Sequence, residues 1–268
     1  MMQWPEPVLV AGPCALEEGD VNVRVAATLA ELAHQLGLRV IYKGSFDKAN
    51  RATADAPRGL GLERGLEALA RVRSETGLPI LTDVHEPAQA GVVAEVVDVL
   101  QIPAFLCRQT DLLTAVGAQR KPVNIKKGQW MSPEAMSGAV EKVRRAGSDA
   151  TAVTERGTFF GYGDLVVDMR SFRRLRVATG ARVLYDATHS VQKPGAQPTG
   201  GTDGTREDIP HLLLGAAAAG AEGFFVETHP NPGDAPSDGS TMLPLHELPI
   251  LVEQAIEIWA NVHAKAVV

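Results

Sequence analysis

Short apolar runs alternate with longer amphipathic segments along the chain. The eight runs read "PVLVAGPC", "RVIYKGSF", "LPILTDVH", "VVDVLQIPA", "PVNIKKG", "ATAVTERG", "ARVLYDATHS" and "EGFFVETHP". Between them, segments such as 20–37, 132–147, 205–220 and 245–265 place apolar residues at helical spacing. Segment 132–147 opens with Ser-Pro-Glu, a typical helix start. The pattern therefore predicts eight strand–helix units.

Strands that are apolar throughout and alternate with helices indicate a parallel sheet covered by helices. Eight such units predict a closed (β/α)₈ barrel, and the 268 residues suit one such domain over 1–268. A doubly wound open sheet is the alternative fold. No linker, charge run or low-complexity block divides the chain.

Composition narrows the classes of function. The net charge of −6 disfavours a nucleic-acid partner. Two cysteines are too few for a disulfide framework, which indicates a reducing compartment. The N-terminus lacks the pattern of a signal peptide, and the longest apolar stretch is interrupted by Gly and by Glu222. We therefore expect a cytoplasmic protein without a membrane partner.

Polar side chains with metal-binding chemistry stand where three apolar runs end. Cys14 follows the first run, His189 ends the seventh and Glu227 ends the eighth, whose loop carries Asp234 and Asp238. In a closed barrel, strands seven, eight and one are neighbours, so these groups would converge. A thiolate, an imidazole and two carboxylates suit Zn(II), Fe(II) or Mn(II). Spacing does not choose between the two aspartates.

Each predicted ligand also has a purely structural interpretation. Cys14 can be a small buried hydrophobe, and His189 a hydrogen-bonded core residue. Glu227 can pair with a lysine, and Asp238 can cap a turn. Their convergence favours a metal site only if the barrel closes, because strands one and eight of an open sheet need not meet.

Basic side chains terminate other strands. The second run leads to Lys43, Lys48 and Arg51, the fifth to Lys126 and Lys127, and the sixth to Arg156, while the third carries Asp83 and His85. Clustered cations in an acidic chain indicate anionic ligands such as phosphorylated acids or sugars. The sequence contains no P-loop or dinucleotide fingerprint, so nucleotide binding is disfavoured.

These residues lie in motifs that resemble the 3-deoxy-D-manno-octulosonate 8-phosphate synthases, a family of (β/α)₈ barrels. The motifs are "AGPCALE", "YKGSFDKANR", "TDVHE", "QIPAFLCRQTDLL", "PVNIKKGQ", "TERG", "DATHSVQKPG", "ETHP" and "TMLPL", and they span nearly the whole chain. The resemblance implies condensation of phosphoenolpyruvate with arabinose 5-phosphate and water, for lipopolysaccharide synthesis. It also implies a homotetramer in which Phe105 and Arg108 lie near a neighbouring subunit's site.

The resemblance also assigns residues to roles. Cys14, where the metal-independent branch carries Asn, implies the metal-dependent branch. The implied metal ligands are Cys14, His189, Glu227 and Asp238. The implied phosphoenolpyruvate-binding residues are Lys43, Lys48, Lys126 and Arg156. Asn50 and Arg51 would hold the pentose phosphate, and Asp83 and His85 would line the reacting centre with Lys43 and Lys48.

The sequence departs from the family pattern at two places, and three rival functions stay open. Ala52 replaces a serine of "KANRSS", with Thr53 as a possible substitute, and Lys193 stands where many members have an apolar residue. The rivals are a heptulosonate phosphate synthase using erythrose 4-phosphate, a metal-dependent aldolase without phosphoenolpyruvate, and a non-catalytic sugar-phosphate-binding barrel. The strand-two motif of the heptulosonate enzyme resembles "KPRTS" rather than "KANR".

Overall fold

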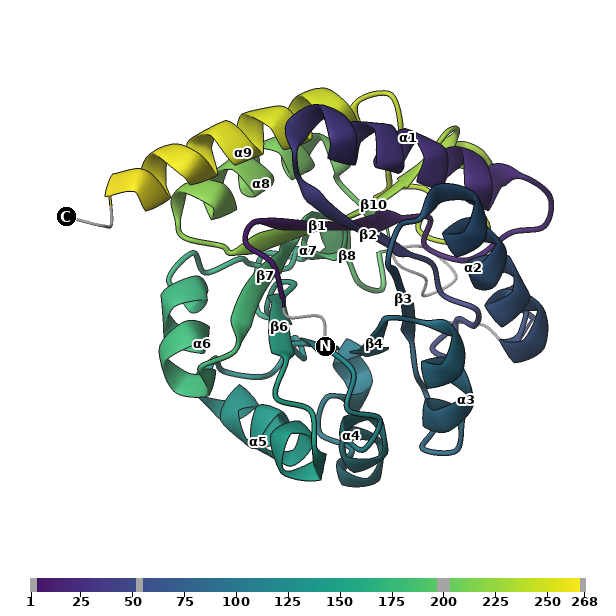
Figure 1. Cartoon of the computed structure of the whole chain (residues 1–268). Helices are drawn as coiled ribbons and strands as arrows, with labels where there is room; N and C mark the ends of the chain where they lie inside the picture. Colours follow the sequence, from purple (N-terminus) through teal and green to yellow (C-terminus); the bar gives the residue numbers. More distant parts are fainter. Residues whose placement is uncertain (1–3, 52–54, 197–202, 266–268) are drawn as a thin grey trace.

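The computed structural model describes residues 4–51, 55–196 and 203–265, and the backbone alone for 264 and 265. Eight parallel strands form a closed barrel, because the first strand pairs with both the second and the last (Figure 1). The strands are β1 (Val8–Gly12), β2 (Arg39–Lys43), β3 (Ile80–Asp83), β4 (Val99–Ile102), β5 (Val123–Lys126), β6 (Thr151–Glu155), β7 (Arg182–Asp186) and β10 (Gly223–His229). The predicted closed barrel is thus confirmed, and the alternative of an open sheet is wrong.

Helices surround the barrel on its outer face (Figure 1). They are α1 (Val21–Leu36), α2 (Leu62–Thr76), α3 (Gln89–Val96), α4 (Thr110–Gly117), α5 (Ser137–Ala146), α6 (Ser171–Thr179), α8 (Ile209–Ala218) and α9 (Leu248–Lys265). Because side chains alternate along a strand, the apolar core divides in two. A large layer lies between strands and helices, and a smaller cluster including Val10 and Phe225 fills the barrel interior.

Short elements decorate the loops that follow the strands. They are α7 (Ala187–Ser190), β8 (Gln192–Lys193), β9 (Asp203–Gly204) and β11 (Leu243–Pro244), with 3₁₀ helices at Ala104–Leu106, Glu134–Met136, Arg206–Asp208 and Pro232–Asp234. β8 pairs with β9 in antiparallel fashion, and β11 extends the sheet beside β10. These loops frame the carboxyl ends of the strands, where barrels place their active sites.

Two local features set the geometry at those ends. A Cβ atom at Gly12 would lie 2.0 Å from the carbonyl oxygen of Lys43, so only glycine lets β1 end this close to β2. The sequence suggested that the seventh strand ends at His189, but it ends at Asp186. The Asp186 carboxylate accepts a hydrogen bond from the His189 backbone N–H at 2.9 Å, which starts the helical turn α7.

Within the described residues, no helix has the combination of length and hydropathy that crossing a bilayer requires.

Candidate active site

Three of the four predicted metal ligands converge at the end of β1 and β10. Cys14, Glu227 and Asp238 each place one ligand atom within 4.8 Å of the others. The Cys14 thiol donates to Asp238 Oδ2 at 2.8 Å. Asp234 instead accepts from the Asn231 side chain, so Asp238 is the aspartate that joins the cluster.

The fourth predicted ligand, His189, lies beside this cluster with one ring nitrogen held by a carboxylate. Its Nδ1 is 2.7 Å from Asp186 Oδ2, and its Nε2 is 3.6 Å from Glu227 Oε2. A carboxylate on one imidazole nitrogen fixes the ring and directs the other nitrogen toward a metal. Asp186 thus serves as the orienting partner of His189.

The donor set fits a divalent metal ion. Glu227 Oε2 is buried and has no hydrogen-bond partner in the described part of the chain, so it can accept a cation. Burial, followed by the charges of Asp238 and Glu227, raises the pKa of the Cys14 thiol. A bound cation would reverse this balance and favour the thiolate. One soft sulfur, one imidazole and two carboxylates suit a transition metal better than Ca²⁺ or Mg²⁺.

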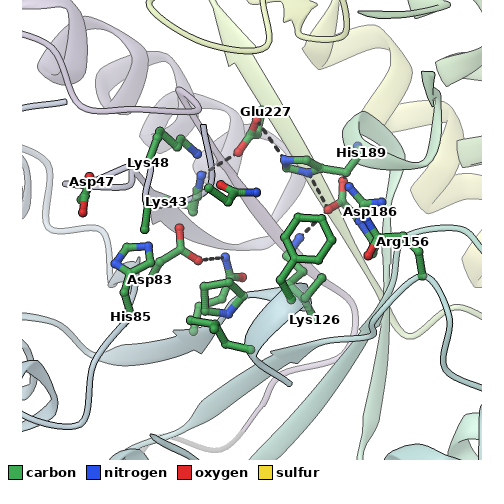
Figure 2. Close-up of a pocket in the computed structure, with 18 residues that line it drawn as sticks. Lys43, Asp47, Lys48, Asp83, His85, Lys126, Arg156, Asp186, His189 and Glu227 are labelled. Carbon is green, nitrogen blue, oxygen red and sulfur yellow. Dashed lines mark hydrogen bonds and ion pairs between the residues drawn. The ribbon is translucent and has the colours of Figure 1, made fainter. Parts of the chain in front are cut away.

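Buried lysines stand directly beside two of the predicted metal ligands, Glu227 and His189 (Figure 2). Lys43 donates to Glu227 Oε1 at 2.6 Å and to the Cys14 carbonyl at 2.9 Å. Lys126 donates to Asp186 at 2.5 Å and places its ammonium 3.0 Å from the centre of the Phe225 ring. Burial lowers the pKa of Lys126 to about 8, although Asp186 opposes this shift.

Asp83 and His85 extend the cavity toward β3. Asp83 accepts hydrogen bonds from Ser45 and, at 2.6 Å, from Gln101 Nε2. Burial opposes the ionisation of Asp83, but the neighbouring groups, led by Lys43 and Lys48, together hold its pKa below the usual range. Burial lowers the pKa of His85, so this imidazole is neutral near pH 7.

Arg156 forms the opposite wall of the cavity. Its Nη2 donates to Gln192 Oε1 at 2.7 Å, whereas its buried Nη1 has no partner among the residues described. Together with the lysines, it lines a cavity of about 210 Å³ that also reaches Asn50, Phe105 and Gln129. An N–H group that is buried and unpaired beside two lysines is suited to binding an anion.

Two predicted basic residues do not line this cavity. Lys127, the residue after β5, is fully buried and its Nζ lies 3.3 Å from Glu155 Oε1. Adjacent strand residues face opposite sides, so its inclusion in the basic cluster was wrong. Arg51 donates to the Pro57 carbonyl, to Ser237 Oγ at 2.7 Å and to the Pro236 carbonyl, and it lies outside the cavity lining.

Only one of the two departures from the family pattern falls on a described residue. Lys193 pairs with Asp164 at 3.2 Å. Ala52 and Thr53 lie outside the described residues. The structural alternative for Glu227, pairing with a lysine, is realised by Lys43, but only one carboxylate oxygen is used in that pair.

Sequence reasoning missed the uncharged side chains that hold the charged ones. Thr154 donates to Asn124, Asn124 to Gln101 and Gln101 to Asp83, which forms a chain of amides and hydroxyls inside the barrel. These residues stand at inward positions of β6, β5 and β4, within otherwise apolar runs. A polar residue within an apolar strand was the signal that could have identified them.

Comparison with known proteins gives consistent matches over almost the full length. The model of the DAHP synthetase I family matches residues 5–262. Two similar proteins, both named 2-dehydro-3-deoxyphosphooctonate aldolase, come from Rhodopseudomonas palustris and Nitratidesulfovibrio vulgaris. The first is 51% identical over 93% of this chain and 86% of its own length, and the second is 50% identical over 95% and 93%.

A third protein of the same name, from Bradyrhizobium diazoefficiens, is 52% identical over 92% of this chain and 87% of its own length. The barrel, the cavity lined by basic residues and these matches agree. The chain belongs to the DAHP synthetase I family.

Proposed function

We propose that this protein is a 3-deoxy-D-manno-octulosonate 8-phosphate synthase. It condenses phosphoenolpyruvate with arabinose 5-phosphate and water, and it releases inorganic phosphate. The observation that carries this proposal is one cavity in which buried cations meet a transition-metal ligand set. The printed names of relatives that are about half identical over almost the whole chain support the same activity.

In this proposal, the substrates divide the cavity between them. Lys43, Lys48, Lys126 and Arg156 hold the carboxylate and phosphate of phosphoenolpyruvate. Asn50, which lines the cavity, and Arg51, beside it, hold the pentose phosphate. Two mutually repelling anions are thereby brought together, which is a proximity contribution to catalysis.

The protein's own groups handle protons at the reacting centre. Because burial lowers its pKa, His85 stays neutral, and its buried Nδ1 has no partner within the described ranges. This nitrogen can accept a proton, while the ionised Asp83 stabilises positive charge that develops nearby. A divalent metal on Cys14, His189, Glu227 and Asp238 would supply Lewis acidity to orient the aldehyde.

We also propose a cytoplasmic homotetramer in which the segment around Phe105 and Arg108 approaches a neighbouring copy. Phe105 and Trp130 are stacked with ring centroids 6.1 Å apart, and both are more than two-fifths exposed. Exposed aromatic pairs at the rim of a site are suited to burial against a second copy. Sedimentation that finds only monomer at micromolar concentration would refute this assembly.

Release of inorganic phosphate separates the proposal from its rivals. The metal-loaded protein should release phosphate when both phosphoenolpyruvate and arabinose 5-phosphate are present, and not with either alone. A non-catalytic binding barrel would release none with any aldose phosphate. A heptulosonate enzyme would release it with erythrose 4-phosphate at least as fast as with the pentose.

A further inference from the structure

Asp238 is held from two sides by uncharged side chains. Gln192 Nε2 donates to its Oδ1 at 2.9 Å, and Ser237 Oγ donates to its Oδ2 at 3.0 Å. Gln192 and Ser237 are both at least nine-tenths buried. Both carboxylate oxygens are therefore fixed by neighbours before any ion binds.

The backbone at Asp238 makes this support necessary. Its φ of 53° lies in the left-handed region, which residues other than glycine seldom adopt. The Asp238 carbonyl accepts the backbone N–H groups of Thr241 and Met242, each at 2.9 Å. A conformation of this kind persists when its surroundings determine it, and Gln192 and Ser237 are part of those surroundings.

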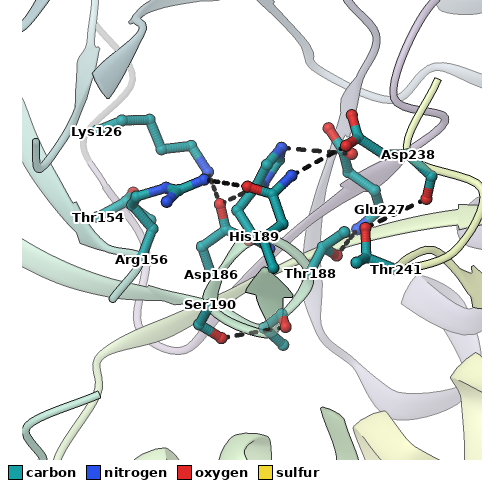
Figure 3. Close-up of polar contacts among 12 residues, drawn as sticks. Lys126, Thr154, Arg156, Asp186, Thr188, His189, Ser190, Glu227, Asp238 and Thr241 are labelled. Carbon is teal, nitrogen blue, oxygen red and sulfur yellow. Dashed lines mark hydrogen bonds and ion pairs between the residues drawn. The ribbon is translucent and has the colours of Figure 1, made fainter. Parts of the chain in front are cut away.

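Each of the two supporting residues is in turn held by an arginine. Arg156 Nη2 donates to Gln192 Oε1 at 2.7 Å, and Arg51 Nη1 donates to Ser237 Oγ at 2.7 Å. Figure 3 shows Arg156 and Asp238 on opposite sides of His189, with hydrogen bonds running between them. A continuous path therefore joins an anion-binding residue to a metal ligand.

The two arginines differ in how many of their nitrogen atoms already donate hydrogen bonds to the protein. Arg156 keeps its buried Nη1 unpaired in the described structure, so an anion can bind there without displacing Gln192. The Nε, Nη1 and Nη2 atoms of Arg51 each donate to the protein. The path through Gln192 can therefore tighten when phosphoenolpyruvate binds, whereas Arg51 is already held by three protein groups, so the path through Ser237 changes less.

We propose that Gln192 and Ser237 are positioning residues for the metal ligand Asp238, and that Gln192 couples anion binding at Arg156 to metal affinity. This inference rests on the proposed function for the identity of the anion, phosphoenolpyruvate. An anion that immobilises Arg156 also immobilises Gln192 and Asp238, so these side chains lose less conformational freedom when the metal then binds. By linkage, the metal strengthens anion binding by the same factor.

The test measures Zn²⁺ affinity by competition with a chromophoric chelator, with and without saturating phosphoenolpyruvate. In the unmodified protein, phosphoenolpyruvate should tighten Zn²⁺ binding about fivefold or more. Gln192→Met should weaken Zn²⁺ binding about 10-fold to 100-fold and abolish the enhancement. Ser237→Ala should weaken Zn²⁺ binding but keep the enhancement, and Ser237→Thr should restore affinity.

Matched controls come from exposed residues of the same types. Gln35→Ala in α1 and Ser74→Ala in α2 should leave both affinities unchanged. Thermal unfolding confirms that each variant is folded, and Gln192→Ala serves if Gln192→Met is not. No enhancement in the unmodified protein, or full enhancement in a folded Gln192 variant, would overturn the proposal.

The coupling through Gln192 can fail while the proposed function holds, and the experiment distinguishes the two results. Calorimetry with phosphoenolpyruvate and phosphate release with both substrates are measured on the same samples. Binding and turnover without coupling would reject only the role of Gln192. Failure to bind phosphoenolpyruvate would reject the proposed function itself.

Discussion

The cavity has two halves that are built differently. In the first half, the buried half, the charged groups stand at the ends of β2, β5, β6, β7 and β10 or within three residues of them, and they form buried pairs such as Lys43 with Glu227 and Lys126 with Asp186. On the side of the loop after β2, Lys48 is half-buried and Asn50 is exposed. The first half is organised before substrate arrives, whereas the second depends on a loop.

This difference indicates a division of labour between chemistry and substrate choice. Side chains on strand ends are fixed by sheet register, which suits groups that must meet a reacting atom within a fraction of an ångström. A loop can change in length and sequence without disturbing the barrel, which suits recognition of the variable partner, the aldose phosphate. Three predictions test the first half, in decreasing order of expected effect.

The largest effect should follow loss of the metal site. Chelation should abolish turnover, and a divalent metal should restore it. Cys14→Ala should reduce both metal content and kcat by at least about a hundredfold, because second-shell changes alone cost 10–100-fold. Metal analysis and phosphate release measure both quantities.

The matched control is Cys107→Ala, since Cys107 is the second buried cysteine and lies in the apolar layer outside the barrel. This variant should keep its metal. Full activity in protein shown to be free of metal would contradict the account.

The next effect concerns stability. Burial opposes the ionisation of Glu227, but Lys43 helps to hold the pKa of this carboxylate below its usual range. Lys43→Met leaves that carboxylate buried without its cation and should cost about 3–5 kcal/mol of unfolding free energy. Adding Glu227→Gln should recover most of the loss, which chemical denaturation measures.

An exposed pair provides the comparison for this effect. Arg145→Met breaks the ion pair with Glu141 on the surface of α5 and should change stability far less. Equal losses in the two single variants would show that the Lys43 pair does not stabilise the buried half.

The smallest effect is a dependence on pH. With a folded pKa of about 8, below the usual value for lysine, Lys126 loses its charge as pH rises through 8 in the free protein. The kcat/KM for phosphoenolpyruvate should therefore be constant below pH 8 and fall up to tenfold per pH unit above it. Lys126→Arg keeps its charge, so its profile should stay flat to higher pH, and an unmodified protein that is flat to pH 10 would refute the assignment.

The sequence predicted the barrel and most of the buried half, because each apolar run changes abruptly to polar residues at its carboxyl end. Closure of the barrel then placed Cys14, Glu227 and Asp238 together, as expected. The hydrogen bonds of Arg51 could not be predicted from the sequence, because its partners Pro57 and Ser237 lie in loops, whose course no periodicity fixes. Alternation of side chains at the end of β5 is the physical signal that separates Lys126 from Lys127.

The hydrogen-bonded neighbours were also beyond sequence reasoning. Gln192 and Gln101 are uncharged, and each bonds side chains that are far from it along the chain. Only the folded structure shows which side-chain amide donates a hydrogen bond to a given carboxylate.

The division of labour is tested most directly by comparing kcat/KM for arabinose 5-phosphate and erythrose 4-phosphate in the unmodified protein and in Arg51→Ala. The sugars share an aldehyde and a phosphate, so only the distance from anchor to reacting carbon and the extra hydroxyl distinguish them. Misplacement of about 1 Å can cost a hundredfold in rate, so we expect a strong preference for the pentose. Arg51→Ala should largely abolish that preference and leave the KM for phosphoenolpyruvate nearly unchanged. Equal efficiency with both sugars in the unmodified protein, or an unaltered preference in Arg51→Ala, would contradict the account.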